Sequence, residues 1–148
     1  MQSNIQDNPG TAKTWTLTFR LIDLNQLRGV NLIRADLRGM DFRGADLAHA
    51  HLSGANLQGA NLRGANLAEA YLFQTNLSGA DLTGADLRGA DLTDANLTGA
   101  CLSGARLEAA YLTRTNLSQT DLSGTDLQAA FVWQVDLGTA RVPDAISI

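Results

Sequence analysis

The chain has 148 residues, which fits a single domain, and carries a net charge of −4. No stretch approaches the ~20 consecutive apolar residues of a membrane-spanning helix, and no basic stripe is present to follow a nucleic-acid backbone. Neither a membrane nor nucleic acid is therefore expected as a partner.

The chain begins with a polar segment, MQSNIQDNPG, and we expect residues 1–13 to form a disordered tail. This segment has no apolar run of the kind found in a secretory signal. The one cysteine, Cys101, cannot form an internal disulfide, which is typical of a reducing compartment. These features predict a cytoplasmic protein.

Residues 14–26 are expected to cap the N-terminal end of the core that follows. Their run TWTLTFRLI alternates large apolar residues with Thr and Arg, as a half-buried strand does. A short amphipathic helix over residues 17–28 is the alternative interpretation, and the sequence leaves both open.

A five-residue repeat occupies residues 27–142 without an inserted residue. Of its 24 central positions 21 hold Leu, and 16 of the 24 positions two residues earlier hold Ala. Asp or Asn is common one residue before the central position, and Gly two residues after it. The remaining residues, 143–148, are expected to form a tail, because Pro143 has no N–H to give to a further rung.

Neither an α-helix nor a straight strand places every central Leu on one side. Five residues advance a helix by ~500°, so the leucines would wander around its axis. In a strand, an odd spacing alternates between the two faces. The repeat instead fits a chain that is extended for about three residues and then turns a corner. Leu and Ala then point inward, and Gly supplies the positive φ or the space that a corner needs.

The repeated phrase A(D/N)LxG resembles the pentapeptide repeat family, and its nearly invariant Leu resembles the cyanobacterial branch. The resemblance implies an all-β fold, a right-handed quadrilateral parallel β-helix with about six coils of four pentapeptides. One observation supports a 20-residue coil independently, because Asn residues 20 positions apart would form one column with ~4.8 Å between rungs. These residues are Asn56, Asn76, Asn96 and Asn116.

The repeat assigns the central positions to the core. One column of such positions, at intervals of 20 residues, consists of Leu47, Leu67, Leu87, Leu107 and Leu127.

No catalytic or metal-binding constellation is visible in the sequence. The only histidines, His49 and His51, lack convergent ligands, since a four-sided coil places His51 two rungs from Asp91. No nucleophile–base pair, carboxylate dyad or pocket-forming insertion interrupts the repeat, and its Gly-rich corners lack the helix that follows a phosphate-binding loop. We therefore expect no enzyme, no cofactor and no small-molecule substrate.

The outward aromatic side chains gather on one of the four expected faces. We name this side the aromatic face and define it as the four-residue segments that begin at residues 31, 51, 71, 91, 111 and 131. It contains Asp91 together with Tyr71, Phe73, Tyr111, Phe131 and Trp133. Aromatic residues with a few charges are the composition of binding hot spots. We predict a surface for a protein partner or for self-association; stacking that only stiffens the face is the alternative.

The predicted function is that of a rigid, non-catalytic scaffold or protein-interaction module. The alternative is inhibition of DNA gyrase by DNA mimicry, which the quinolone-resistance members of the family imply. Residues 75–148 hold four basic and nine acidic residues, a net charge of −5, as a DNA mimic requires. Those members differ in often placing Phe at central positions, whereas this chain does so only at Phe42, and in carrying a dimerising helix or projecting loops.

Overall fold

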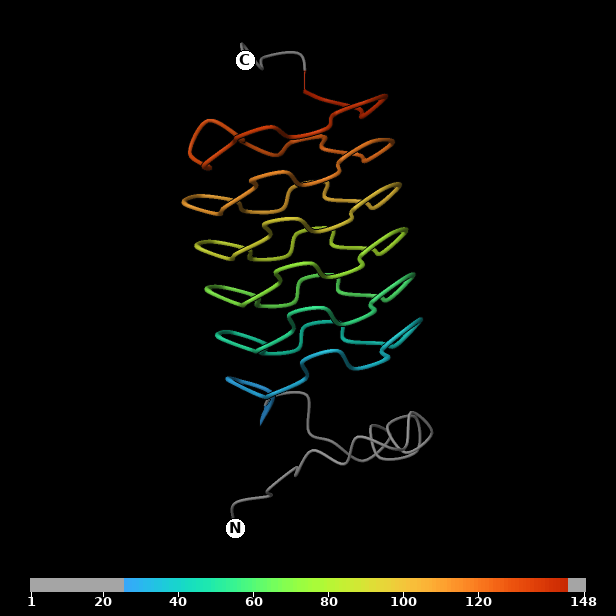
Figure 1. The fold of residues 1–148 in the computed structure, drawn as a ribbon, viewed down its shortest axis with the longest axis vertical. Helices are drawn as coiled ribbons and strands as arrows, with labels where there is room; N and C mark the ends of the chain where they lie inside the picture. Colours follow the sequence, from blue (N-terminus) through green and yellow to red (C-terminus); the bar gives the residue numbers. More distant parts are fainter. Residues whose placement is uncertain (1–25, 144–148) are drawn as a thin grey trace.

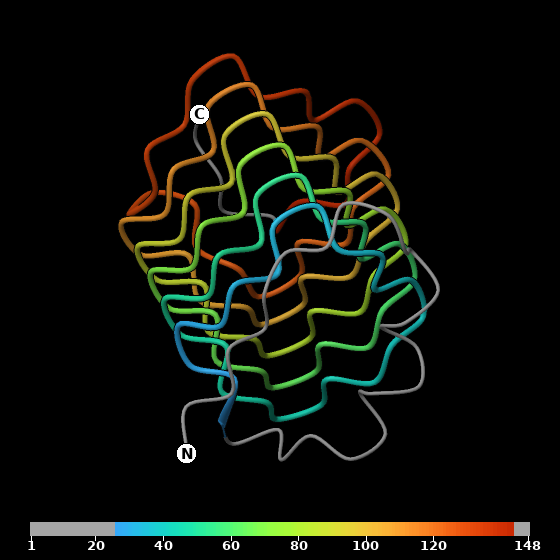
Figure 2. The same cartoon turned by 60° about the horizontal axis from the view of Figure 1, so that its bottom comes forward.

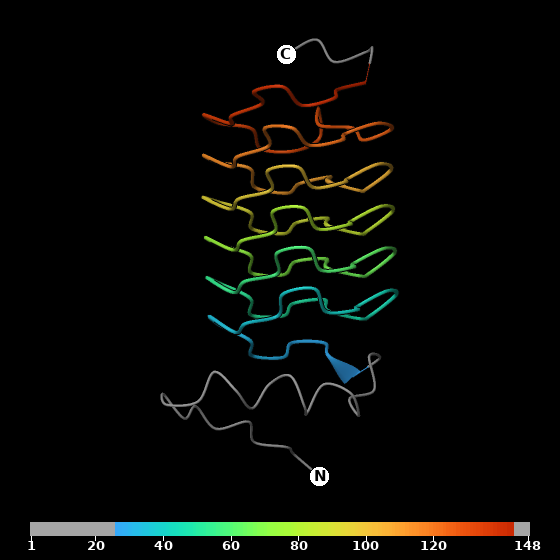
Figure 3. The same cartoon turned by 90° about the vertical axis from the view of Figure 1, so that its right-hand side faces the viewer.

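A computed structural model of the protein describes residues 26–143. The expected tail 1–13, the expected cap except for Gln26, and residues 144–148 lie outside the described part. Figure 1 shows successive coils stacked along one axis, from residue 26 at one end to residue 143 at the other. The perpendicular view in Figure 3 shows the same even stacking, so the described residues form one continuous solenoid.

Single bridge residues, rather than longer strands, build the ladders, and the described residues contain no α-helix. Each of the 18 parallel bridges joins a residue to the one 20 positions later, as between Tyr71 and Asp91. The bridges fall into four columns, which begin at residues 31, 36, 41 and 46. One coil therefore has four sides and 20 residues, and Figure 2 shows successive coils following the same outline.

The backbone of each repeat bonds to the coils on both sides and to its own corner. Leu32 N donates to His51 O in the next coil at 2.8 Å, and His51 N donates back to Val30 O at 2.8 Å. Ala35 N then donates to Leu32 O at 3.1 Å and closes the corner. This arrangement recurs along the solenoid and gives the chain its alternation of short extended segments and turns.

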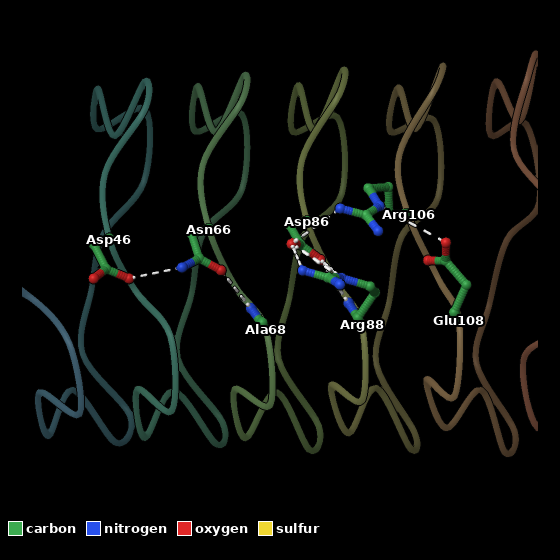
Figure 4. Close-up of polar contacts among 7 residues, drawn as sticks. All are labelled: Asp46, Asn66, Ala68, Asp86, Arg88, Arg106 and Glu108. Atoms are coloured by element: carbon green, nitrogen blue, oxygen red, sulfur yellow. Dashed lines mark hydrogen bonds and ion pairs between the residues drawn. The ribbon is translucent and has the colours of Figure 1, made fainter.

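The Asp or Asn before the central Leu accepts a hydrogen bond from the backbone N–H two residues later, which the ladders do not use. Ala68 N donates to Asn66 Oδ1 at 3.1 Å, two residues earlier (Figure 4). The amide nitrogen of Asn66 donates in turn to Asp46 Oδ1, in the preceding coil, at 3.0 Å. The preference for Asp and Asn therefore follows from their ability to close an Asx turn at the corner that follows them.

The predicted column of Asn residues is present. Bridges join Asn56 to Asn76, Asn76 to Asn96, and Asn96 to Asn116. Asn76 Nδ2 donates to Asn56 Oδ1 at 3.2 Å, and Asn96 Nδ2 donates to Asn76 Oδ1 at 3.5 Å. The 20-residue coil is thus confirmed, and with it the division of the chain into four faces.

The interior of the solenoid consists of Leu and Ala side chains. The predicted column from Leu47 to Leu127 is buried, and its exposure reaches 8% only at Leu127. Where Thr replaces Ala, its hydroxyl is bonded, as in the contact from Thr75 Oγ1 to Leu52 O at 2.9 Å. No buried side-chain nitrogen or oxygen in the described part lacks a partner.

The last coil corrects the expectation that every central position faces a closed core. Val132 is 44% exposed and Val142 40% exposed, because no described coil packs above them. The corner at Ala129 also lacks the positive φ of most other corners. As a result Ala109 N bonds to Ala129 O, at 2.7 Å, instead of to the carbonyl of the residue before it.

Candidate interaction face

The aromatic face holds most of the exposed large hydrophobic side chains. Its five predicted aromatic residues all point outward, with exposures from 37% at Phe73 to 66% at Trp133. Eight large hydrophobic side chains are exposed in residues 26–143, and six of them point outward from this face. The other two, Val132 and Val142, are central residues exposed at the end of the stack. Ile33, which was not predicted from the aromatic pattern, is 50% exposed and occupies the same place in its repeat as Phe73 and Trp133.

Four rings on the aromatic face form two separate stacks. His51 and Tyr71 have ring centroids 4.8 Å apart and planes inclined by 18°, and Tyr111 and Phe131 have the same values. Tyr71 is nevertheless 49% exposed and Tyr111 48% exposed. Stacking and exposure, which the sequence presented as alternatives, therefore coexist, because each tyrosine has one ring face covered by its stacking partner and the rest of the ring exposed.

The aromatic face departs from the repeat in its bridge residues. Elsewhere Asp or Asn usually occupies the bridge position and accepts the N–H two residues later, as Asn96 does from Thr98 at 3.1 Å. On this face aromatic rings take that position in four coils, at His51, Tyr71, Tyr111 and Phe131. None of these four rings accepts such a bond in the described residues, so the ring residues are not explained by the needs of the corner.

The corners of the aromatic face depart from the repeat as well. Among the described residues, nine non-Gly residues have positive φ, and five of the nine lie on this face. They are Arg34, Gln74, Asp94, Arg114 and Gln134. The left-handed conformation costs an L-residue roughly 1 kcal/mol or more relative to Gly. The fold alone would favour Gly at these corners, as it has at Gly54.

Asp91 lies between the two ring stacks, where an open pocket has a volume of about 360 Å³. Asp91 Oδ1 accepts a hydrogen bond from Thr93 N at 3.0 Å. Gly89 leaves room for the side chain of Glu69, because a Cβ on residue 89 would come within 3.2 Å of Glu69 Cγ. The residues lining the pocket are Glu69, Ala70, Tyr71, Gly89, Asp91, Thr93 and Tyr111.

Asp94, the other acidic residue of the aromatic face, is paired with arginine. Asp94 accepts hydrogen bonds from Arg114 Nε at 2.6 Å and from Nη2 at 2.7 Å. These bonds lower the pKa of Asp94 and raise the pKa of Arg114. On another face Arg88 binds Asp86 in the same two-pronged manner (Figure 4) and lowers the pKa of that carboxyl. Asp91, by contrast, has no basic partner among the described residues.

The two histidines do not form a metal centre. His49 Nδ1 lies 3.4 Å from Glu69 Oε2, whereas His51 belongs to a ring stack. Within residues 26–143, no group of three or more His, Cys, Asp or Glu side chains is arranged to hold a metal ion. The same residues include no helix with the length and apolar character needed to cross a bilayer.

The sequence matches the family of pentapeptide repeats, in 8 copies, over residues 26–64, 50–89, 65–104 and 90–128. The chain therefore belongs to the pentapeptide repeat family, and its fold is the right-handed quadrilateral β-helix of that family. No curated protein matches it.

Solved structures of cyanobacterial family members are similar to this chain. The pentapeptide repeat protein Rfr23 from Cyanothece 51142 is 32% identical, with a TM-score of 0.69 over 78% of this chain and 89% of that chain. HetL from Nostoc sp. strain PCC 7120, involved in heterocyst differentiation regulation, is 29% identical, with a TM-score of 0.53 over 80% of this chain and 75% of that chain. QnrB1, a plasmid-mediated fluoroquinolone resistance protein, is 23% identical with a TM-score of 0.38, over 83% of this chain and 87% of that chain.

Proposed function

We propose that this protein is a rigid, non-catalytic scaffold that binds another protein through its aromatic face. The observation that carries the proposal is the gathering of exposed apolar side chains on one face of four, where all six of the large outward-pointing ones in the described residues lie. Contiguous exposed apolar surface is uncommon on monomeric soluble proteins and marks interaction sites.

Two features of the face support a role in binding over a role in stability. Its rings stand where the fold elsewhere uses Asp or Asn to close an Asx turn. Its corners place non-Gly residues at positive φ, with values from 52° at Gln134 to 58° at Asp94. The rings and the non-Gly corners both reduce the stability of the fold, and binding of a partner would explain why they are present.

The solenoid suits this role because its surface is fixed. Every coil is bonded to the next through regular backbone hydrogen bonds of about 3 Å, as between Leu87 N and Arg106 O at 2.8 Å. The backbone positions of the aromatic face are therefore held in register, and a partner does not have to order them, which lowers the entropic cost of association. With one free cysteine, Cys101, the cytoplasm is the location that we propose.

The proposal is tested with a variant that carries Tyr71→Ser, Tyr111→Ser and Trp133→Ser. The immobilised wild-type protein is expected to retain a specific partner from a lysate of the source cells, and the triple variant is expected to lose it. A matched control changes three exposed arginines on the opposite face: Arg43→Ser, Arg63→Ser and Arg141→Ser. The control should retain the partner as the wild type does.

Self-association is measured in parallel by analytical ultracentrifugation of the same three proteins. A dimer that only the aromatic-face variant loses would identify a second copy of the chain as the partner. If the aromatic-face variant and the arginine variant behave alike in capture and in sedimentation, the face is not an interaction surface.

A further inference from the structure

We propose that the pocket between Tyr71 and Tyr111 binds the guanidinium group of an arginine side chain presented by a partner protein. The inference rests on the proposed function, because it specifies what a partner of the aromatic face would insert at this point. It concerns the interruption of the ring column at Asp91, whose Oδ1 closes the corner of its own repeat with Thr93 N and whose other carboxylate oxygen faces the pocket.

The spacing of the two tyrosines suits one inserted planar group. Tyr71 stacks on His51 through one ring face, and Tyr111 stacks on Phe131, so the uncovered ring faces look toward each other across the rung of Asp91. Two rungs separate the tyrosines by roughly 9.6 Å, twice the ~4.8 Å strand spacing. A cation at the level of Asp91 would then lie about 4.8 Å from each ring, within the ~6 Å range of cation–π attraction.

The charges that line the pocket select a cation. Asp91 and Glu69 contribute two carboxylates, and no basic side chain lines the pocket. Asp91 Oδ1 bonds to Thr93 N, and Oδ2 has no bonded donor among the described residues. Glu69 Oε2 lies 3.4 Å from His49 Nδ1, at the edge of the same site. A cationic ligand would therefore find an unpaired carboxylate between two ring faces.

Arginine fits this site better than the alternatives. A guanidinium group is planar, so it can lie parallel to both rings while its edge donates to the carboxylate. The same chain shows such pairing between Arg114 and Asp94, with contacts of 2.6 and 2.7 Å. A lysine ammonium has no flat face and is more strongly hydrated. A neutral aromatic ring would fit the spacing but would leave Asp91 desolvated and unpaired.

The experiment uses the fact that Tyr71 and Tyr111 are the only two tyrosines in the chain. Protein with ¹³C-labelled tyrosine rings gives NMR signals from this site alone. Both signals are expected to shift on titration with blocked arginine (N-acetyl-arginine methylamide) and to saturate in the millimolar range. The blocked citrulline analogue, which has the same shape without the charge, should cause no comparable shift, and blocked lysine should bind more weakly.

The variant Asp91→Asn removes the charge and keeps the acceptor for Thr93 N. It should fold, because Asn already occupies the same place in other repeats, such as Asn96. Loss of a charge-assisted bond should weaken arginine binding by roughly tenfold or more. The matched control Asp136→Asn changes an exposed bridge Asp on a neighbouring face, whose Oδ1 accepts from Gly138 N at 2.9 Å, and should leave binding unchanged.

Three results would overturn the inference: no shift of the tyrosine signals with arginine, an equal response to citrulline or lysine, or undiminished binding by Asp91→Asn. The citrulline comparison uses the wild-type protein, so it decides the matter even if a variant misfolds. Failure here leaves the proposed function intact, because partner capture tests the whole face. Failure of partner capture, in turn, would not prevent the tyrosines from responding to arginine.

Discussion

Single side chains of the repeat combine a local and a longer-range role. Asn76 accepts the N–H of Ser78 at 3.1 Å within its own corner and donates to Asn56 in the preceding coil at 3.2 Å. An Asp at the same place keeps the first bond and replaces the second with an attraction for arginine, as Asp81 shows with Arg63 Nη1 at 3.3 Å. The choice between Asn and Asp therefore changes the surface charge without changing the corner.

Leu87 tests the contribution of one core residue. It is fully buried, so Leu87→Ala should lower the free energy of unfolding by ~2–5 kcal/mol through an internal cavity. Leu87→Asp should unfold the middle coils, because a buried carboxylate without a partner costs several kcal/mol. Urea denaturation followed by circular dichroism measures both, with the exposed Gln58→Ala as control. A Leu87→Asp protein with the midpoint of the wild type would contradict this assignment.

Gly84 and Gln74 test the corner from both directions. Gly84 has a φ of +65°, and no atom lies within 4 Å of the Cβ that Ala would add. Gly84→Ala should therefore lower the free energy of unfolding by roughly 1 kcal/mol through backbone conformation alone. Gln74 has a φ of 56°, so Gln74→Gly should raise that free energy by up to ~1 kcal/mol.

Denaturant midpoints of the two corner variants are compared with that of the wild type. A gain of stability in Gln74→Gly would show that the corners of the aromatic face are not optimised for folding. A loss in Gln74→Gly similar to that in Gly84→Ala would mean that the Gln74 side chain itself stabilises the coil.

At the scale of the ladders, acidic side chains make stability depend on pH. Hydrogen bonds from arginine or serine side chains lower the pKa of several carboxyl groups: Asp36, Asp41, Asp86, Asp94 and Asp121. A lowered pKa in the folded state stabilises the protein above the unfolded value of ~3.9, and that stabilisation is lost as the pH falls through the folded value.

The melting temperature should therefore change little between pH 7 and about pH 5 and should fall below about pH 4. Asp86→Asn should reduce the steepness of that fall, because it removes the carboxyl that Arg88 Nη2 approaches to 2.6 Å. Thermal melts at a series of pH values measure both. A melting temperature that rises on acidification would contradict the prediction.

The ladders also show how far the sequence predicts the structure. The repeat predicts that the side chain of every central residue in the inner coils points inward. If these leucines pointed outward, each coil would expose apolar side chains to solvent. The 20-residue period then places Tyr71 and Tyr111 on one face. The same period makes the two stacked ring pairs neighbours on successive rungs. The angle and distance between the rings do not follow from the period, because they depend on side-chain conformation, and the pocket at Asp91 arises only from the three-dimensional arrangement of seven residues.

The irregularity of the last coil could not be predicted from the repeat either. Val132 and Val142 occupy regular positions, and only the lack of a described coil above them leaves them exposed. Gly138 stands one place early in its repeat and has a φ of 39°, so the corner there is shifted. Such end effects depend on what covers the stack, which the periodicity within the stack does not specify.

The whole molecule is not expected to imitate DNA. Although residues 75–148 have a net charge of −5 in the sequence, several of their carboxylates are already paired with arginine, as Asp86 and Asp94 are. Purified protein should therefore not inhibit supercoiling by DNA gyrase at micromolar concentration. Potent inhibition that disappears in the variant Asp81→Asn, Asp86→Asn and Asp91→Asn would reverse this conclusion.

The uniform advance of 20 residues per coil means that the molecule can be lengthened or shortened in whole steps. Excision of residues 82–101 would join Asp81 to Leu102 with the repeat in phase. Tyr71 and Tyr111 would become neighbours, and the two ring pairs would merge into one continuous column. The distance between the tyrosines therefore changes only in steps of ~4.8 Å, the spacing between neighbouring coils. Gain or loss of one coil therefore changes which groups the aromatic face can bind, although no remaining side chain is substituted.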